Sequence, residues 1–292
     1  MICKAMQRIV DVLNLGNVRV DDAQEYQVLS PKSPTSPTPS SYDFAMPCQT
    51  IIFLDWDDTL FPTSYIKEWK LQGKPGTKAL LPLTPFQESL LEEWQHAVHG
   101  YLLQASAVSD AVVILTNSKP PWVDECLELF AGKMHDEIKN IPGLKVVYAR
   151  DFLTRSDKVR DRGSAALSVT PDAEEKKEQF HQVLKSAKFR AMKAEATRFY
   201  SQYHKQSWKN IISIGDAHFE RDAALDLAFR RHSPRERLRM KTLVTPEKPS
   251  LASLTKRLKI GSSHGLARIA QLDEDLDFDM NHIQDMHEMS EK

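Results

Sequence analysis

Five short apolar runs between Ile51 and Thr245 constrain the fold of this chain more than any other feature. They are residues 51–54, 111–116, 144–149, 210–215 and 241–245. Short runs rich in Ile and Val are typical of strands that are buried on both faces of a sheet. The segments between them are long enough for helices, and strand–helix alternation favours a parallel sheet. We therefore expect an α/β fold, with a three-layer, Rossmann-like parallel sheet of about five strands and helices on both faces.

Helix signals lie in the segments between these runs. Thr84-Pro85-Phe86-Gln87 combines an N-cap residue, a proline in the first turn and a glutamine three residues after the cap. The apolar residues that follow share one predicted helix face: Phe86, Leu90, Trp94, Val98 and Tyr101. Further helices are expected from the Pro120-Pro121 pair, over roughly 174–206, and after Asp216.

The two ends of the chain differ from this pattern. Residues 1–48 hold a short possible helix and then a stretch rich in Pro and Ser that favours a disordered linker. From Asp273 onward the chain has eight acidic residues and a single Lys292. Blocks of like charge are typical of solvated tails. The expected organisation is an N-terminal region over 1–48, one domain over 49–260 and an acidic C-terminal tail over 261–292.

Charge and cysteine content narrow the choice of partners and compartment. The formal net charge of −1 gives no general attraction to nucleic acid, and no apolar run reaches the length of a membrane span. Cys3, Cys48 and Cys126 share no spacing typical of metal ligands and are typical of reduced thiols. We expect a cytoplasmic protein, with a nuclear one as the alternative, that binds neither nucleic acid nor membrane. Its oligomeric state is unknown at this stage.

The first apolar run leads directly into a cluster of carboxylates, Asp55, Asp57 and Asp58. In an open parallel sheet, ligands bind beyond the carboxyl ends of the strands. Carboxylates placed this close together repel each other unless a cation or a shared proton intervenes. Mg²⁺ fits this position because it prefers oxygen ligands and keeps several waters that a phosphate can replace.

The spacing Asp55-x-Asp57-x-Thr59-Leu60 resembles the first motif of the haloacid dehalogenase (HAD)-like hydrolase superfamily. The run that ends in Thr116-Asn117 is similar to the second motif, and the run that ends in Gly215-Asp216 is similar to the fourth. The third motif is a lone lysine. Lys188, at the start of "KFRAM", resembles it, and Lys185 and Lys193 are rivals. The resemblance covers residues 50–245 and leaves both ends untouched.

The resemblance implies a role for each matched residue. Asp55 would be the nucleophile that forms an aspartyl-phosphate, and Asp57 would be the general acid and base. Within the family this second aspartate marks phosphatases and phosphotransferases, and dehalogenases lack it. The Thr116 hydroxyl and a neighbouring backbone N–H, such as that of Asn117, would hold the phosphoryl oxygens, and Lys188 would offset negative charge.

The resemblance also implies a Mg²⁺ site. Asp55, the main-chain carbonyl of Asp57, and Asp216 would hold the ion. A second acid usually follows in the fourth motif. Glu220, four residues after Asp216, is our choice, and Asp222 is the alternative.

These expectations combine into a hypothesis of function. The chain would be a Mg²⁺-dependent phosphatase that hydrolyses phosphomonoesters, carried by a small molecule or by a phosphoprotein. The segments 61–83 and 151–170 suit a small flap and an exposed loop, so we expect a nearly capless enzyme with an open site. A catalytically silent HAD-like module that binds phosphate or a protein partner is the alternative. A phosphotransferase that passes the phosphoryl group to an alcohol is a third option.

Overall fold

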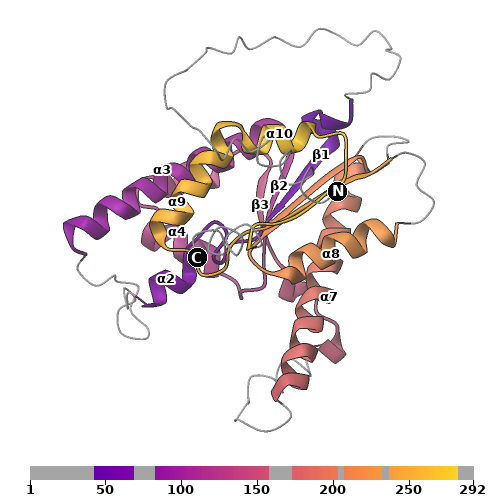
Figure 1. Cartoon of the computed structure of the whole chain (residues 1–292), viewed down its shortest axis with the longest axis horizontal. Helices are drawn as coiled ribbons and strands as arrows, with labels where there is room; N and C mark the ends of the chain where they lie inside the picture. Colours follow the sequence, from indigo (N-terminus) through magenta and orange to yellow (C-terminus); the bar gives the residue numbers. More distant parts are fainter. Residues whose placement is uncertain (1–42, 69–82, 158–172, 203–206, 232–236, 282–292) are drawn as a thin grey trace, which may run out of the picture.

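The structure is a computed structural model that describes residues 43–68, 83–157, 173–202, 207–231 and 237–281. Its centre is a parallel sheet of six strands in the order β3-β2-β1-β4-β5-β6 (Figure 1). The strands are β1 (Thr50–Leu54), β2 (Ala111–Thr116), β3 (Leu144–Tyr148), β4 (Asn210–Gly215), β5 (Arg239–Val244) and β6 (Leu276–Asp279). The α/β, three-layer, Rossmann-like class expected from the sequence is confirmed, and the expected number of strands was one too low.

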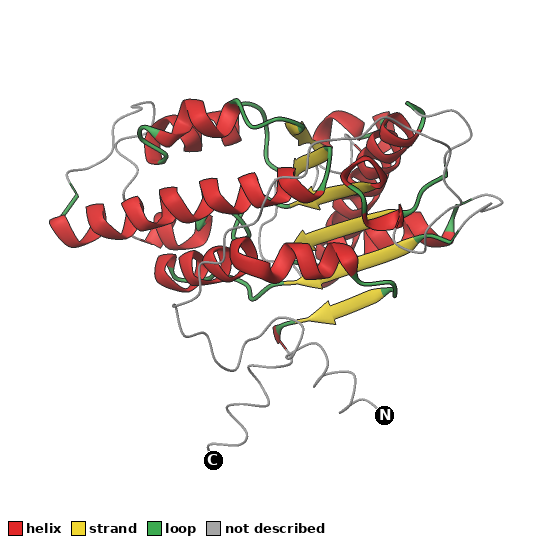
Figure 2. Ribbon diagram, turned by 90° about the horizontal axis from the view of Figure 1, so that it is seen from above, coloured by secondary structure: helices red, strands yellow, loops and turns green. Residues whose placement is uncertain are grey.

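Helices cover both faces of the sheet, and Figure 2 shows the strands between them. On one face lie α3 (Pro85–Val108), α4 (Trp122–Phe130), α5 (Met134–Lys139), α9 (Leu251–Ile260) and α10 (Leu266–Gln271). On the other face lie α7 (Ala173–Tyr200) and α8 (His218–Phe229). The remaining helical pieces are α2 (Thr63–Glu68), η1 (Asp43–Ala45), η2 (Pro47–Gln49), η3 (Ala149–Phe152) and the π-helical turn η4 (Gly261–Gly265).

The continuous apolar runs follow from burial on both faces. In β1, Ile52 and Leu54 pack against the face that α3 covers, whereas Ile51 and Phe53 pack against the face that α7 covers. Successive side chains of a strand point to opposite faces, so a strand between two helical layers needs an apolar residue at every position. This is why β1 and the two strands beside it, β2 and β4, could be located in the sequence.

Helix α3 begins with the expected capping box. Gln87 N donates to Thr84 Oγ1 at 3.3 Å, and Thr84 N donates to Gln87 Oε1 at 2.9 Å. Trp94 and Val98 are buried as expected, but Phe86 is 70 % exposed. The expectation that Phe86 belongs to the inner face was wrong, because the first turn of α3 extends beyond the packed part of the helix (Figure 1).

The acidic C-terminal end of the domain differs from the expected organisation. Residues 261–279, assigned to a solvated tail, form η4, α10 and β6. The acids of this segment have basic or hydroxyl partners: Asp277 binds Arg221 and accepts from Thr242 Oγ1 at 2.8 Å, and Asp273 pairs with Arg239 at 2.6 Å. Phe278 is buried in the sheet layer. The domain therefore continues past residue 260, because ion pairs offset the acidic charge.

Two other sequence expectations fall outside the described residues. The linker within 1–42 and most of the proposed flap and loop, 69–82 and 158–172, are not described. The end of the N-terminal region is described, and there Phe44 is buried with the Arg239 guanidinium 4.1 Å from its ring centre. Within the described ranges, no helix has the length and apolar content needed to cross a membrane.

Lys241 of β5 generates a prediction about pH. Its fully buried side chain donates to Asn210 Oδ1 at 2.7 Å and to the Ala270 carbonyl at 2.9 Å. Burial, reinforced by Arg239, lowers the pKa of Lys241 to about 7. The unfolded chain therefore binds more protons than the folded one from pH 7 up to the ordinary lysine pKa, so this group makes stability rise with pH across that window.

We expect Lys241→Met to lose this rise, which amounts to at most about 1.4 kcal/mol per pH unit. Urea unfolding of both proteins at several values from pH 7 to pH 10 measures it. Lys256→Met, which removes an exposed lysine of α9, is the control and should keep the wild-type slope. Equal slopes for the wild type and Lys241→Met would contradict the prediction.

Candidate active site

The carboxyl ends of three neighbouring strands meet at one cleft of about 720 Å³. Asp55 directly follows β1, Asn117 follows β2, and Asp216 follows β4. The cleft is lined by Asp55, Asp57, Asn117, Ser118, Asp216 and Glu220, together with residues of α7, the η3 turn and the loops around them. The structure thus brings together the residues from the first, second and fourth sequence motifs.

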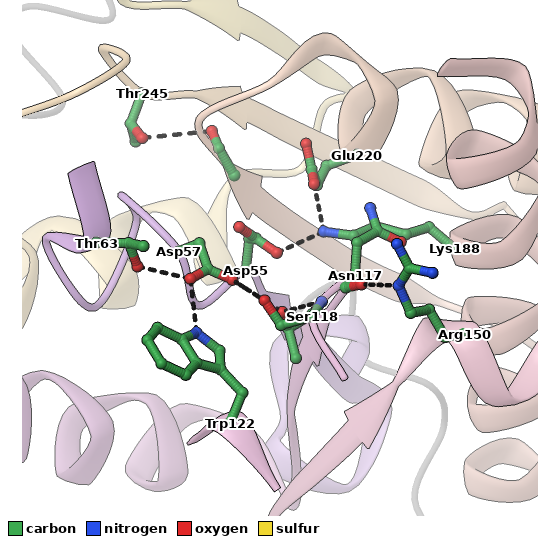
Figure 3. A network of polar contacts seen from close by, with 12 residues as sticks. Asp55, Asp57, Thr63, Asn117, Ser118, Trp122, Arg150, Lys188, Glu220 and Thr245 are labelled. Carbon is green, nitrogen blue, oxygen red and sulfur yellow. Dashed lines mark hydrogen bonds and ion pairs between the residues drawn. The ribbon is translucent and has the colours of Figure 1, made fainter. Parts of the chain in front are cut away.

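Lys188 of α7 is fully buried and contacts two of the carboxylates that line this cleft (Figure 3). Its Nζ lies 2.5 Å from Asp55 Oδ1 and also contacts Glu220 Oε1. Ala187 and Ala191 bring this part of α7 close to the sheet, where both are fully buried. A long side chain at position 188 can therefore span the gap between helix and strand.

The same geometry separates Lys188 from its two rivals. Lys185 pairs with Asp226 of α8 at 3.2 Å, and Lys193 is exposed. Among the described residues, the lysine that pairs with Asp55 and Glu220 is Lys188 rather than either of these two.

The structure also distinguishes Glu220 from Asp222 as the second acid of the fourth motif. Glu220 lies in the first turn of α8, is 3 % exposed and lines the cleft. Asp222 is half-buried and pairs with Arg221 at 3.1 Å. The close approach of Glu220 to the strand end depends on Gly215, because a Cβ there would lie 2.6 Å from Glu220 Cγ.

Asp57 accepts four side-chain hydrogen bonds. Thr63 Oγ1 and Trp122 Nε1 donate to its Oδ1 at 2.6 and 2.8 Å, and Thr116 Oγ1 and Ser118 Oγ donate to its Oδ2 at 3.1 and 2.8 Å. The four donors match an ionised carboxylate, which only accepts hydrogen bonds. They also fix the carboxylate in place.

Three of these four donors were not found from the sequence. Thr63, Ser118 and Trp122 lie at the ends of loops or helices, where no periodic pattern marks them. Thr116 was identified from the sequence, but with a different role. Its hydroxyl was expected to hold phosphoryl oxygens and here donates to Asp57, while the Ser118 N–H donates to it at 2.9 Å.

Asn117 is the residue of the second motif that is left for a ligand. Among the described residues, neither its side-chain nitrogen nor its side-chain oxygen has a hydrogen-bond partner, although both are buried. Arg150, which also lines the cleft, donates from Nε to the Asn117 carbonyl at 2.7 Å. Arg150 was not identified from the sequence, since a lone arginine after the third strand carries no recognisable signal.

The turn after β1 is held by its own side chains. Asp58 has a positive φ of 56° and accepts hydrogen bonds from the N–H and hydroxyl of Ser64 at 2.8 and 2.5 Å. A short acidic side chain tolerates this left-handed conformation. Trp56, fully buried, stacks on Phe61 with ring centres 5.6 Å apart. These contacts position Asp55 and Asp57 on a rigid support.

The carboxylates of the cleft affect one another strongly. Burial raises the pKa of Asp55 to about 6, against the opposing effect of Lys188. Burial, with repulsion from Asp55 and Glu220, raises the pKa of Asp216 to about 8. The pKa of Glu220 is also raised to about 8, mainly by burial. The attraction of one buried lysine is therefore too small to keep the pKa values of Asp216 and Glu220 in their usual range.

The oxygen atoms at this end of the sheet are suitable ligands for a hard divalent cation. Asp55 and Asp216 offer carboxylate oxygens, and a cation bound to them would relieve the repulsion by Asp55 that helps to raise the pKa of Asp216. Within the part of the chain that is described, no three His, Cys, Asp or Glu side chains are arranged to hold a metal ion. A site here would accordingly use two carboxylates, main-chain oxygen and water, which is the ligand set that Mg²⁺ accepts.

Comparisons of the chain with protein families, with characterised proteins and with solved structures found no match. The chemistry of the cleft therefore has to be argued from its own side chains.

The buried ion-pair network predicts a large effect of Lys188 on stability. Lys188→Met leaves Asp55 and Glu220 without their cation, and breaking a buried pair in this way costs about 3 kcal/mol or more. Urea unfolding at pH 7 measures the loss. Lys185→Met, one turn earlier on α7, removes only a partly exposed pair and should cost less than about 1 kcal/mol.

A double variant tests the cause of this loss. Adding Glu220→Gln to Lys188→Met removes one of the two uncompensated carboxylates and should restore part of the lost stability. If the second substitution only adds to the loss, the network does not stabilise the fold in the way described.

Proposed function

We propose that the protein is a Mg²⁺-dependent phosphatase of the HAD-like superfamily, which hydrolyses phosphomonoesters through an aspartyl-phosphate on Asp55. The observation that carries the proposal is the contact of buried Lys188 with both Asp55 and Glu220 beside the first strand end. A buried aspartate that lines a cleft and has one carboxylate oxygen held by a lysine can serve as a nucleophile through its other oxygen. The order of the four motifs along the chain supports the same assignment.

The first half of the reaction transfers the phosphoryl group to the protein. Lys188 holds Oδ1 of Asp55, so we assign the attack on phosphorus to Oδ2. A bond forms between this oxygen and phosphorus, the ester bond breaks, and the leaving oxygen takes a proton from Asp57. We assign to the side-chain amide of Asn117, which lines the cleft and has no partner among the described residues, the role of donating to a phosphoryl oxygen. Positioning and charge stabilisation supply most of what this reaction needs from a protein.

The second half returns the protein to its starting state. Asp57 takes a proton from water, the water oxygen bonds to phosphorus, and the bond to Asp55 breaks to release phosphate. The four donors fix the position of Asp57, and one of them has to make way before the carboxylate can take this proton. In the next cycle Asp57 gives the same proton to the leaving oxygen, which takes the place of that donor. Ser118, which lines the cleft, is the donor that can make way most easily.

The Mg²⁺ ion would be held by Asp55, Asp216 and the main-chain carbonyl of Asp57, with Glu220 behind them. Its contribution when bound is to offset the charge of the phosphoryl oxygens. Glu220 reaches this region through Lys188, so we assign it the role of holding the lysine rather than of contacting the ion.

The substrate is a phosphomonoester on a small molecule or on a protein. The cleft is wide, and its outer wall includes exposed His181 and His218. We place the enzyme in the cytoplasm, a reducing compartment consistent with Cys48 and Cys126, which form no disulfide within the described ranges.

A second candidate function is a catalytically silent module that binds phosphate. The four hydrogen bonds to Asp57 favour it, because a carboxylate held by four donors can also serve only to fix the loop. The behaviour of Asp57 variants distinguishes the two.

We expect Asp55→Asn and Asp57→Asn to fail differently. Asp55→Asn removes the nucleophile, so no phosphoryl adduct should form. Asp57→Asn keeps the nucleophile, and an aryl phosphate needs little protonation of its leaving oxygen. This variant should form the adduct slowly and then accumulate it, because loss of general acid–base help slows hydrolysis by about 10²–10⁴-fold.

Intact-mass measurement after acid quenching detects the adduct. Wild-type protein with the same aryl phosphate gives the reference turnover. An adduct on both variants, or wild-type turnover by both, would overturn the assignment of Asp55. Absence of turnover and of adduct in all three proteins would favour the silent module.

Turnover is expected to require Mg²⁺ and to be inhibited by Ca²⁺. Ca²⁺ accepts more ligands in a looser geometry and can bind both oxygens of Asp55, which blocks its attack. The measurement is phosphate release with added Mg²⁺, with added Ca²⁺, and in excess EDTA. Full activity in EDTA would refute this requirement.

A further inference from the structure

A second cavity lies behind the loop that carries Asp55 and Asp57. It has a volume of about 90 Å³, is partly open to solvent and has an almost entirely apolar wall. The wall comes from β4, β5, α9, η4 and α10, and includes Ile214, Leu243, Leu258, Leu266, Ile269 and Met280. None of these residues lines the cleft of the proposed active site. The cavity is therefore a separate site.

Two buried polar groups line this apolar cavity without complete hydrogen bonding. Thr59 is 5 % exposed, and among the described residues its hydroxyl has no partner. The Nε of Arg257 is likewise buried and without a partner in the described ranges. A buried donor that stays unpaired costs about 1–3 kcal/mol unless a ligand or water satisfies it.

Arg257 also lacks a counter-ion. Its Nη1 and Nη2 donate to the carbonyls of Pro246 and Asp58 at 3.2 and 3.3 Å, and no carboxylate of the described residues is within ion-pair distance. Burial lowers the pKa of Arg257 although Asp216, Tyr101 and Asp58 all oppose the shift. The positive charge is thus only partly offset, which favours an anionic ligand.

The size of the cavity limits the ligand. A water molecule takes about 30 Å³ and a cavity of about 150 Å³ holds benzene, so this space suits about four carbon atoms with the chain end toward solvent. A single water would pair with Thr59 and Arg257 but would leave the apolar wall unfilled. A short aliphatic chain with one anionic group would pair with Thr59 and Arg257 and would also fill the space along the apolar wall.

We propose that this cavity is a binding site for a short-chain aliphatic carboxylate, with the carboxylate on Arg257 Nε and the Thr59 hydroxyl and the chain against α9 and α10. The site borders the turn after β1, because Arg257 also holds the Asp58 carbonyl. It does not depend on the proposed phosphatase activity.

The probes are butanoate, its neutral analogue butan-2-one and the cation butylammonium. A ligand of about six non-hydrogen atoms should bind with a Kd on the order of 1 mM. Ligand-observed NMR titration and thermal unfolding of the full chain measure binding without any activity assay. We expect saturable binding and a raised Tm with butanoate, at least about tenfold weaker binding of butan-2-one, and no binding of butylammonium.

Three variants locate the site. Arg257→Met removes the guanidinium, and Lys256→Met, its exposed neighbour on α9, removes the same charge outside the cavity. Gly265→Val adds a side chain at the cavity wall, where a Cβ meets the Ile260 carbonyl oxygen at an ordinary 3.4 Å. Butanoate binding should be lost in Arg257→Met and in Gly265→Val and kept in Lys256→Met.

The Gly265→Val variant keeps the test decisive if Arg257→Met does not fold, since it leaves both hydrogen bonds of Arg257 in place. No saturable butanoate binding to the wild type would overturn the proposal. Equal binding by the wild type and folded Gly265→Val would overturn it too, because the ligand would then lie elsewhere. Equal affinity for butanoate and butan-2-one would overturn the role given to the charge of Arg257.

Discussion

A buried lysine between two buried carboxylates is the interaction on which the rest of the site depends. Lys188 bridges Asp55 and Glu220, and all three side chains are almost fully removed from solvent. Removing three charged groups from water costs free energy, which the mutual attraction returns only with close geometry. That geometry requires the small residues Ala187 and Ala191 on α7, as well as Gly215 at the end of β4. The packing of the helices against the sheet is therefore adapted to the ion pair.

β1, β2 and β4 could be predicted because burial on both faces makes them nearly continuous apolar runs, whereas the edge strand β3 and the strand β5 are apolar over part of their length. β6 could not, because Leu276–Asp279 has only four residues, in which two apolar side chains alternate with two acids inside an acidic block. As an edge strand it pairs on one side only, with β5, and its acids find partners such as Arg221 from distant parts of the chain. Local sequence contains no information about such partners.

In the candidate site, too, a sequence pattern identifies some residues and not others. Asp55, Asp57 and Asp216 follow strand ends, so their positions come directly from the strand pattern. Lys188 shares a buried helix face with Leu184, Ala187 and Ala191, and this spacing is a signal in the sequence that distinguishes it from Lys193.

No signal of this kind in the sequence identifies the hydrogen-bond donors to Asp57 that come from loops and helix ends. Thr63, Ser118 and Trp122 reach Asp57 from separate loops and helix ends. Only the folded sheet, which sets the strand ends side by side, brings these residues together.

The turn after β1 is where the two sites of the molecule meet. Its front carries Asp55 and Asp57 toward the cleft, and its back offers the Thr59 hydroxyl and the Asp58 carbonyl to the second cavity and to Arg257. Asp58 holds the turn in a left-handed conformation through Ser64, and Trp94 Nε1 holds the Leu60 carbonyl at 2.9 Å. These contacts fix the turn at several points. A ligand that paired with Arg257 would therefore lie one hydrogen bond away from the turn that positions both aspartates, because Arg257 Nη2 donates to the Asp58 carbonyl.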